Sequence, residues 1–374
     1  MNYDFSEKEF TFFTDLHNLM ETLSKEADLE NDNGGDNVML ALNKLAGTPY
    51  LKLALGEDGE LNGLLTLMGA MEVVGAFSPS MLLAIEMSTR VFGRIVSSFG
   101  DDALKERLLP PILEGRLLGS VAVSEASMNV VNEPLKTEGK TDGDKVVLNG
   151  RKQYVVNAPL ADWIAVIGVM DEKPAVFMVE KGTSGLFIED KMPMLGYDGV
   201  AVSGIRLDNC AIDSSNVMGP FDKPTIIDSV KMWENQVLIG AGLGLMKAAF
   251  ESARDYAKAH KSGGKPIIAY QEVGFKLAEM LTLFQTSQLF SYRAAWAADD
   301  NPKDADSFTL SAKVFITESA EKVAGCALQI MGGFGYREGN SAERAFRCSK
   351  YLQIAGTSTE ISRVKIGDAA MGIR

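Results

Sequence analysis

The hydrophobic pattern changes twice along this chain, and that change constrains its fold more than any other feature. Apolar residues follow helical spacing up to about residue 119. Residues 120–222 instead contain short apolar runs, separated by glycine and aspartate, that are typical of strands. Long helical segments then return at 229–260, 268–297 and 307–331. This order predicts an α+β fold with a helical domain at 1–119, a β domain at 120–222 and a second helical domain at 223–374.

The composition excludes several kinds of function. The chain has 374 residues, of which 46% are hydrophobic and 23% charged, so it can bury the cores of more than one domain. Its net charge of −13 argues against nucleic acid as a main partner, because phosphate binding needs basic patches. Three cysteines without metal-site spacing and only two histidines argue against a metal site. The sequence also lacks a Walker A loop and a G-x-G-x-x-G motif after a strand, so nucleotide hydrolysis and NAD-type binding lose support.

The N-terminus and an apolar stretch bear on location. The segment Met1–Phe5 contains Asp4 and has no apolar core of the kind found in signal peptides. Residues 61–85 are apolar but are interrupted by Glu72 and Pro79, which predicts a buried helix rather than a membrane span. We therefore expect a cytoplasmic protein, in a reducing setting that suits its three cysteines.

Two glycine-containing motifs follow each other near the C-terminus. Residues 329–336 read Gln-Ile-Met-Gly-Gly-Phe-Gly-Tyr, and residues 354–363 read Ile-Ala-Gly-Thr-Ser-Thr-Glu-Ile-Ser-Arg. Glycine lets a backbone approach a cofactor closely, but a single Gly-Gly pair is weak evidence. Both motifs in this order resemble the C-terminal signature of the acyl-CoA dehydrogenase family. The resemblance covers essentially the whole chain.

The resemblance implies a fold and an activity. Family members have an N-terminal helical domain, a central β-barrel or sandwich and a C-terminal four-helix bundle. They use FAD to introduce an α,β double bond into an acyl-CoA, and they pass electrons to an electron-transfer flavoprotein. They assemble as tetramers, so we expect a homomeric or heteromeric tetramer. The small residues of Gly240–Gly244 are candidates for close packing between subunits.

Two segments of the β domain resemble the wall against which the flavin ring lies in the family. They are Ala122–Val131 and Asn149–Ala158. A third segment, Ala259–Pro266, stands where the family has R-K-x-F-G-K-P, which reaches the FAD of a neighbouring subunit. With the C-terminal motifs, these segments give the candidate cofactor-binding residues Val123, Ser124, Tyr154, Val155, Val156, His260, Gln329, Gly332, Gly333, Thr357 and Thr359.

Several of these positions depart from the family pattern. The usual Gly-Ser-Asp of the first segment is replaced by Asn129–Val131, and a flavin-contacting Thr is replaced by Val156. The ring-stacking Trp is Tyr154, which keeps an aromatic face. His260 and Gly263 replace the Arg and Phe of the third segment, and a neutral His cannot match the planar donor fork of Arg. His260 is therefore either a substitute phosphate contact or a surface histidine.

The catalytic base has two alternative positions in the family. Many members carry a Glu just before the Gly-Thr-Ser of the last motif, where an ungapped reading places Gly356 and an alignment on Gly-Thr-Ser places Ala355. Neither residue can act as a base. Isovaleryl-CoA and long-chain members use a Glu on the helix before the R-K-x-F-G segment instead, and the corresponding residue is Glu234. The alternative is a solvated Glu at a helix start, stabilised by the helix dipole.

Three readings remain open. The leading one is FAD-dependent dehydrogenation of an acyl-CoA with Glu234 as base. The second is a catalytically silent or half-site subunit that completes the FAD site of a partner chain. The third is a family member with reductive or eliminating chemistry on a CoA thioester.

Overall fold

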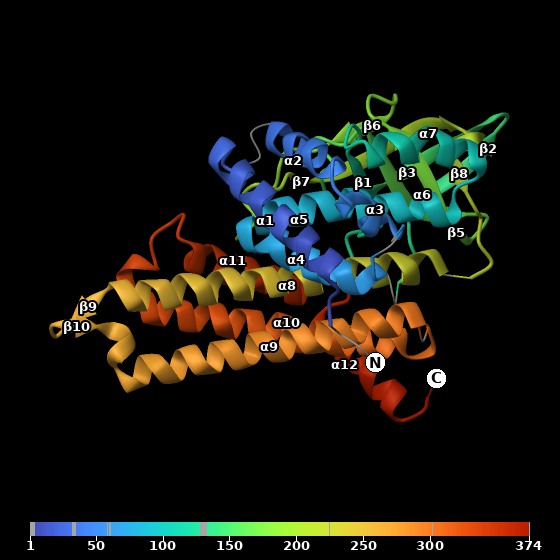
Figure 1. The fold of residues 1–374 in the computed structure, drawn as a ribbon. Coiled ribbons are helices and arrows are strands. Elements are labelled where there is room, and N and C mark those ends of the chain that lie inside the picture. The colour runs from blue at the N-terminus through green and yellow to red at the C-terminus, as the bar shows by residue number, and fades with distance from the viewer. Residues whose placement is uncertain are drawn as a thin grey trace.

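The computed structural model describes residues 4–31, 35–57, 59, 61–127, 133–223, 225–300 and 302–373. It shows a helical N-terminal part, a central sheet and a C-terminal set of long helices, in the predicted order (Figure 1). The α+β class is therefore confirmed. The domain boundaries at 119/120 and 222/223 stay predictions; the first strand begins at Gly119 and the C-terminal helices begin at Thr225.

The N-terminal part consists of short helices around a shared apolar core. Its first helix is started by a capping box, in which Ser6 accepts a hydrogen bond from the N–H of Glu9 and Glu9 accepts one from the N–H of Ser6. Glu9 also accepts a hydrogen bond from the Thr66 hydroxyl, which ties the first helix to the fourth. The elements are α1 (Glu7–Glu26), α2 (Asp36–Ala46), α3 (Tyr50–Leu55), α4 (Gly63–Phe77), α5 (Pro79–Glu86), the π-helical segment η2 (Met87–Gly93), α6 (Arg94–Phe99) and α7 (Asp102–Leu113).

The central part is an eight-stranded sheet. Its strands are β1 (Gly119–Ala122), β2 (Glu138–Asp142), β3 (Lys145–Val156), β4 (Trp163–Met170), β5 (Lys173–Glu180), β6 (Leu186–Ile188), β7 (Val202–Asp213) and β8 (Val217–Met218). The order is β6-β7-β3-β2-β4-β5-β8, with β1 paired in parallel to β4. The long strands β3 and β7 are antiparallel, and their register shifts between Lys152 and Val155. This irregularity lies at the edge of the site described below.

The C-terminal part is built on the three long helices α8 (Thr225–Ala259), α9 (Gln271–Asp300) and α10 (Pro302–Met331), which run beside one another (Figure 1). Two short strands, β9 (Lys261–Ser262) and β10 (Lys265–Pro266), connect α8 to the 3₁₀ turn η4 (Ile267–Ala269) and then α9. A second 3₁₀ turn, η5 (Gly332–Phe334), follows α10. The chain continues through α11 (Ser341–Ile354) and α12 (Thr359–Ala370). No helix among the described residues is long and apolar enough to cross a membrane.

The glycines of α8 pack inside this chain, which corrects the expectation that they face a partner subunit. An added Cβ at Gly240 would lie 2.7 Å from Cβ of Met71. At Gly244 it would lie 2.5 Å from the backbone of Gly75. Both neighbours belong to α4, so these glycines allow α8 to approach α4 closely. Through this contact α8 joins the N-terminal helices to the C-terminal ones.

Candidate functional site

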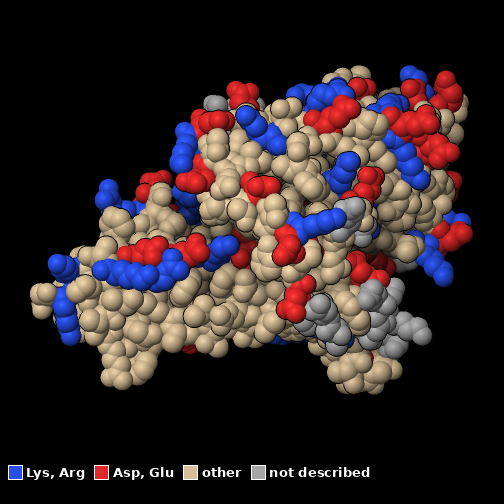
Figure 2. Space-filling view, viewed as in Figure 1, with Lys and Arg blue, Asp and Glu red and all other residues tan. Residues whose placement is uncertain are grey.

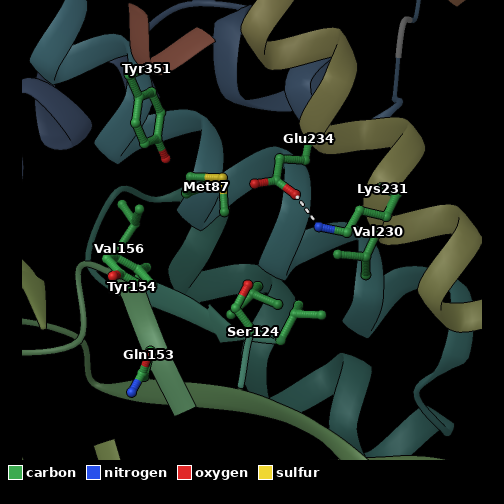
Figure 3. Close-up of a pocket in the computed structure, with 11 residues that line it drawn as sticks. Met87, Ser124, Gln153, Tyr154, Val156, Val230, Lys231, Glu234 and Tyr351 are labelled. Atoms are coloured by element: carbon green, nitrogen blue, oxygen red, sulfur yellow. Dashed lines mark hydrogen bonds and ion pairs between the residues drawn. The ribbon is translucent and has the colours of Figure 1, made fainter. Parts of the chain in front are cut away.

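A narrow cavity forms where the three parts of the chain meet. Its volume is about 40 Å³, which is room for the reacting end of a molecule and not for a whole cofactor. Figure 3 shows residues from α8 on one side and from β3 on the other, with Tyr351 of α11 above them. The lining residues are Met87, Val121, Val123, Ser124, Gln153, Tyr154, Val156, Val230, Lys231, Glu234 and Tyr351. Five of the residues predicted from sequence meet here: Val123, Ser124, Tyr154, Val156 and Glu234.

Glu234 holds its carboxylate in the cavity, between Lys231 and the loop that contains Gly356. Its Oε2 lies 3.4 Å from Nζ of Lys231, and its Oε1 accepts a hydrogen bond of 3.2 Å from the N–H of Gly356. The side chain is only 16% exposed. Because α8 begins at Thr225, Glu234 lies in its third turn and not at a helix start. The alternative of a solvated helix-start carboxylate is therefore wrong.

Gly356 cannot receive a side chain without rearrangement. Its φ is +64°, in the left-handed region that side chains disfavour. An added Cβ would lie 2.5 Å from Oδ1 of Asn235, and that oxygen already accepts a hydrogen bond of 2.9 Å from the N–H of Thr357. Gly356 is the position predicted for the family's alternative base, but a side chain at Gly356 would clash with Asn235. Ala355, which precedes it with a φ of −72°, has an ordinary backbone conformation.

A buried lysine on α10 also fixes the loop that contains Gly356. Nζ of Lys313 donates a hydrogen bond of 2.8 Å to the carbonyl of Ala355 and another to the carbonyl of Thr357. Burial lowers the pKa of Lys313 to about 7, although the charge of Glu234 acts in the opposite direction. Loop 355–357 is thus fixed through its backbone by side chains of α8 and α10.

A buried ion pair aligns the opposite wall of the cavity. Nζ of Lys152 lies 2.8 Å from Oε1 of Glu125 and donates a hydrogen bond of 2.9 Å to the carbonyl of Val123. Burial lowers the pKa of Lys152 to about 8, against the raising influence of Glu125. Burial alone would raise the pKa of Glu125, but its hydrogen bonds, first to Lys152, outweigh that and leave it lowered. The pair fixes the segment after β1 against β3. Both residues lie in the segments singled out above, yet their pairing could not be read from the sequence.

Tyr154 stands at the rim of this wall in an unusual conformation. Its φ is +55°, and 46% of its surface is exposed. Such a value is uncommon outside glycine and is found at functional sites. Val155 points into the sheet core and therefore does not line the cavity, whereas Val156 does. The replaced segment Asn129–Val131 lies outside the described residues.

The other predicted cofactor residues form a second, separate group. His260, Gln329, Gly332 and Gly333 are all exposed and lie at the end of α8 and α10 far from Glu234. Twenty-five residues of α8 separate Glu234 from Ala259, which is about 38 Å of helix. His260 stacks on Tyr256, with ring centroids 4.8 Å apart, and Tyr256 stacks on Phe334 at 5.2 Å. A single copy of this chain does not bring the two groups together.

Thr357 and Thr359 are buried, and the hydroxyl of each makes a hydrogen bond within the chain. The Thr357 hydroxyl accepts a hydrogen bond of 3.1 Å from Asn235, and the Thr359 hydroxyl donates one of 3.1 Å to Glu360. Their side chains are 4% and 2% exposed. In this arrangement they stabilise the loop and the start of α12, and a cofactor role for them stays a prediction.

Sequence reasoning missed several lining residues. Lys231 lies three positions before Glu234, a spacing that puts both on one helix face and could have identified it. Tyr351 carries no such signal, because only packing brings α11 to the cavity. Burial raises the pKa of Tyr351 and the charge of Glu234 raises it further. Its ring centroid lies 5.0 Å from that of Tyr197. Within the described ranges, no three His, Cys, Asp or Glu residues gather as metal ligands would.

Known proteins agree with this architecture. Residues 120–210 match the model of the acyl-CoA dehydrogenase middle domain, and residues 229–371 match that of the C-terminal domain. The chain is 28% identical over 377 residues to a 3-(aryl)acrylate reductase of Clostridium sporogenes, covering 95% of this chain and 98% of that one. It is 30% identical over 330 residues to a cyclohex-1-ene-1-carbonyl-CoA dehydrogenase of Geobacter metallireducens, covering 86% of each.

The fold has close counterparts among solved structures. Butyryl-CoA dehydrogenase of Megasphaera elsdenii superimposes with a TM-score of 0.89 at 23% identity, over 99% of this chain and 100% of that one. At that identity the likeness concerns the fold. The two domain matches and the 30% identical relative, taken with the fold, place this chain in the acyl-CoA dehydrogenase family.

Proposed function

We propose that this chain catalyses FAD-dependent α,β-dehydrogenation of an acyl-CoA, with Glu234 as the base. The observation that carries the proposal is the position of the Glu234 carboxylate. It is in a mostly closed cavity, with the predicted flavin wall on one side and loop 355–357 on the other. A carboxylate positioned in this way can remove a proton next to a thioester.

The residues of the wall suit a flavin ring. Tyr154 offers an exposed aromatic face, and the N–H of Gln153 donates a hydrogen bond of 2.9 Å to the carbonyl of Ser124, which joins the two segments of the wall. Val123 and Val156 add apolar surface. When bound, FAD would accept the hydride from the β-carbon. The chain itself would position the acyl group, exclude water with Met87, Val121 and Val230, and take the α-proton on Glu234.

The second group of cofactor residues supports an assembly. His260, Gln329, Gly332 and Gly333 lie too far from the cavity to serve the same FAD in one copy, so we assign them to the FAD of a neighbouring subunit. We therefore propose a tetramer, homomeric or heteromeric.

The surface of the C-terminal helices is consistent with such an assembly. Figure 2 shows that the face of the molecule over α9 carries few charged side chains, in contrast to the N-terminal and central parts. Exposed large apolar side chains of the C-terminal part are Phe275, Leu281, Leu289, Phe334, Tyr336, Phe346, Ile354, Val364, Met371 and Ile373. We take these side chains, together with the weakly charged face over α9, as support for a protein interface on this part of the molecule. Electrons would leave through an electron-transfer flavoprotein. We also propose a cytoplasmic location, because the three cysteines are unpaired, as is usual in a reducing compartment.

Two alternatives have specific support. The relative that matches nearly the whole chain is a 3-(aryl)acrylate reductase, which favours the reductive direction as a second reading. The departures at Val156, His260 and Gly263 favour a half-site subunit as a third.

One experiment separates these readings. The chain is purified alone, its visible spectrum is recorded, and butyryl-CoA, isovaleryl-CoA and cyclohex-1-ene-1-carbonyl-CoA are added under anaerobic conditions. Bleaching of the flavin by any of them supports dehydrogenation. A flavin that is not bleached but, once reduced with dithionite, is reoxidised by an enoyl-CoA supports the reductive reading. A colourless chain that restores flavin to a co-expressed paralogue supports the half-site subunit.

A further inference from the structure

Lys231 is the feature of the cavity that dehydrogenation by Glu234 alone does not use. Its Nζ lies 3.4 Å from Oε2 of Glu234 and donates a hydrogen bond of 3.0 Å to the carbonyl of Gly356. An ammonium group has three N–H donors, so these two contacts leave one for a ligand. The side chain is 14% exposed and lines the same cavity as Glu234 (Figure 3).

The charge of Lys231 in this cavity needs a physical explanation. Its neighbours in the cavity wall include Val230, Val121 and Met87, and an apolar residue would continue that surface. A charged group in a mostly closed cavity is unfavourable unless an opposite charge stays close to it. Before the reaction that opposite charge is the carboxylate of Glu234.

Proton transfer moves the negative charge away from Glu234. The Cα–H bond of the acyl group breaks, the proton goes to an oxygen of Glu234, and the electron pair passes into the thioester, whose oxygen becomes negative. Glu234 is then neutral, and Lys231 would be left without a counter-ion unless the enolate oxygen takes that place. When bound, FAD would accept the hydride of the β-carbon, which would close the electron balance of the reaction.

We propose that Lys231 is a catalytic electrophile that follows this charge, stabilising the carboxylate of Glu234 before proton transfer and the enolate oxygen of the thioester during it. The proposal rests on the proposed function of Glu234. The N–H of Gly356 is a second donor at the same place, since it donates a hydrogen bond of 3.2 Å to Glu234, and this bond weakens when the carboxylate loses its charge. Preorganised donors of this kind act where charge develops and stabilise the transition state more than the ground state.

The other lysine near the loop does not compete for this role. Nζ of Lys313 lies under the loop and donates to the carbonyls of Ala355 and Thr357, and Lys313 is not among the residues that line the cavity. Lys313 supports the loop, whereas Lys231 faces the space in which the acyl group would react.

The test compares three variants of the flavin-loaded enzyme. Lys231→Met keeps the length of the side chain and removes the charge, Lys231→Arg keeps the charge, and Lys258→Met is the matched control on an exposed face of the same helix. We expect Lys231→Met to lower kcat by about 10²–10³-fold, the usual effect of losing one oxyanion donor, with KM changed by less than about threefold. Lys231→Arg should retain about a tenth or more of the parent kcat, and Lys258→Met should equal the parent.

A binding measurement gives a readout besides turnover. The probe is the 3-thia analogue of the acyl-CoA that the parent uses, which can lose its α-proton but has no β-hydrogen to give. We expect Lys231→Met to bind this probe about 10²-fold more weakly than the parent while binding free CoA equally well. If Lys231→Met fails to fold, Lys231→Gln is measured in the same way.

Two results would overturn the role of Lys231 while leaving the proposed function intact. One is a parent-like kcat in Lys231→Met. The other is an equal loss of affinity for free CoA and for the 3-thia probe, which would mean that the lysine only maintains the shape of the cavity. If no acyl-CoA reduces the flavin of the parent, the proposed function itself fails, and the role of Lys231 fails with it.

Discussion

The N–H of Gly356 donates a hydrogen bond of 3.2 Å to Oε1 of Glu234, although 122 residues separate them in the chain. These are the two positions from which family members are expected to present a catalytic carboxylate. In this fold the N–H of Gly356 lies against the Glu234 carboxylate, which lines the cavity. A base on α8 or on loop 355–357 would therefore lie near the same space, although Gly356 itself has no room for a side chain. In this chain only Glu234 supplies a carboxylate there.

Replacing Glu234 by Gln tests the base directly. The amide keeps the size of the side chain and can still accept the hydrogen bond from Gly356, so fold and flavin content should be unchanged. General-base catalysis contributes about 10²–10⁴-fold, and kcat should fall by that factor. Steady-state kinetics, thermal unfolding and the flavin spectrum check this. Wild-type turnover in Glu234→Gln would disprove the assignment.

Moving the carboxylate to the loop should succeed at Ala355 and fail at Gly356. Ala355 has an ordinary backbone conformation. In the Glu234→Gln background, Ala355→Glu should raise kcat at least about tenfold above that of Glu234→Gln alone. Gly356→Glu needs a left-handed φ of +64° and a Cβ 2.5 Å from Asn235. It should lower stability by more than about 1 kcal/mol and restore nothing. Equal rescue at both positions would contradict the steric argument.

A substitution at Gly333 tests whether this glycine contacts FAD or only packs against the protein. An added Cβ at Gly333 meets no atom within 4 Å, so Gly333→Ala should leave the stability of the protomer unchanged. If Gly333 lies against FAD, that variant should lose flavin from the assembly, as measured by absorbance per subunit. Gly335 is the matched control, because its added Cβ would lie 2.7 Å from Met331 and Gly335→Ala should lower the unfolding temperature. Full flavin content in a stable Gly333→Ala or Gly333→Val assembly would refute the cofactor role.

Lys313 should make stability depend on pH in a defined window. Burial lowers its pKa from the ordinary 10.5 to about 7 in the folded chain. Between these values the unfolded chain holds the proton and the folded chain does not, so the free energy of unfolding rises with pH there. The penalty for burying the charge is complete below about pH 7 and is gone above about pH 10.5.

The measurement for Lys313 is a difference between two proteins. Lys313→Met lacks the titrating group, so the stability of the parent minus that of the variant should increase from pH 7 to pH 10. Denaturant unfolding at several pH values gives this difference. A difference that stays flat or falls would show that Lys313 keeps an ordinary proton affinity in the folded chain.

The assembly can be tested through the apolar face of α9. Leu289 is 60% exposed on that helix, and Phe187 is 47% exposed on β6, a strand at the edge of the sheet. Leu289→Glu should shift the tetramer toward smaller species at micromolar concentration, because a charge in an apolar interface is unfavourable. Phe187→Glu should not. Sedimentation velocity distinguishes these outcomes, and a parent that is monomeric at the same concentration would remove the assembly from the proposal.

The sequence by itself determined the α+β class, the order of the three parts and the long helices, because hydrophobic periodicity is a local property of each segment. It also predicted Glu234 as the candidate base, because the resemblance of segment Ala259–Pro266 to the family fixes the position of Glu234 on the preceding helix. The helix around Glu234 begins at Thr225, earlier than the apolar run suggested, because the first turns of α8 are held by packing on its neighbours.

Only the tertiary structure decided which residues share a site. In the folded chain Lys231 and Tyr351 line the same cavity as Glu234, and Val155 packs in the sheet core. The glycines of α8 pack against α4, and Gly356 has no room for a side chain. The tertiary structure also separates His260 and Gly333 from the cavity by the length of α8. These outcomes depend on distances between segments far apart in the chain. Such distances are set by how helices and sheet pack together, and local sequence patterns carry no record of them.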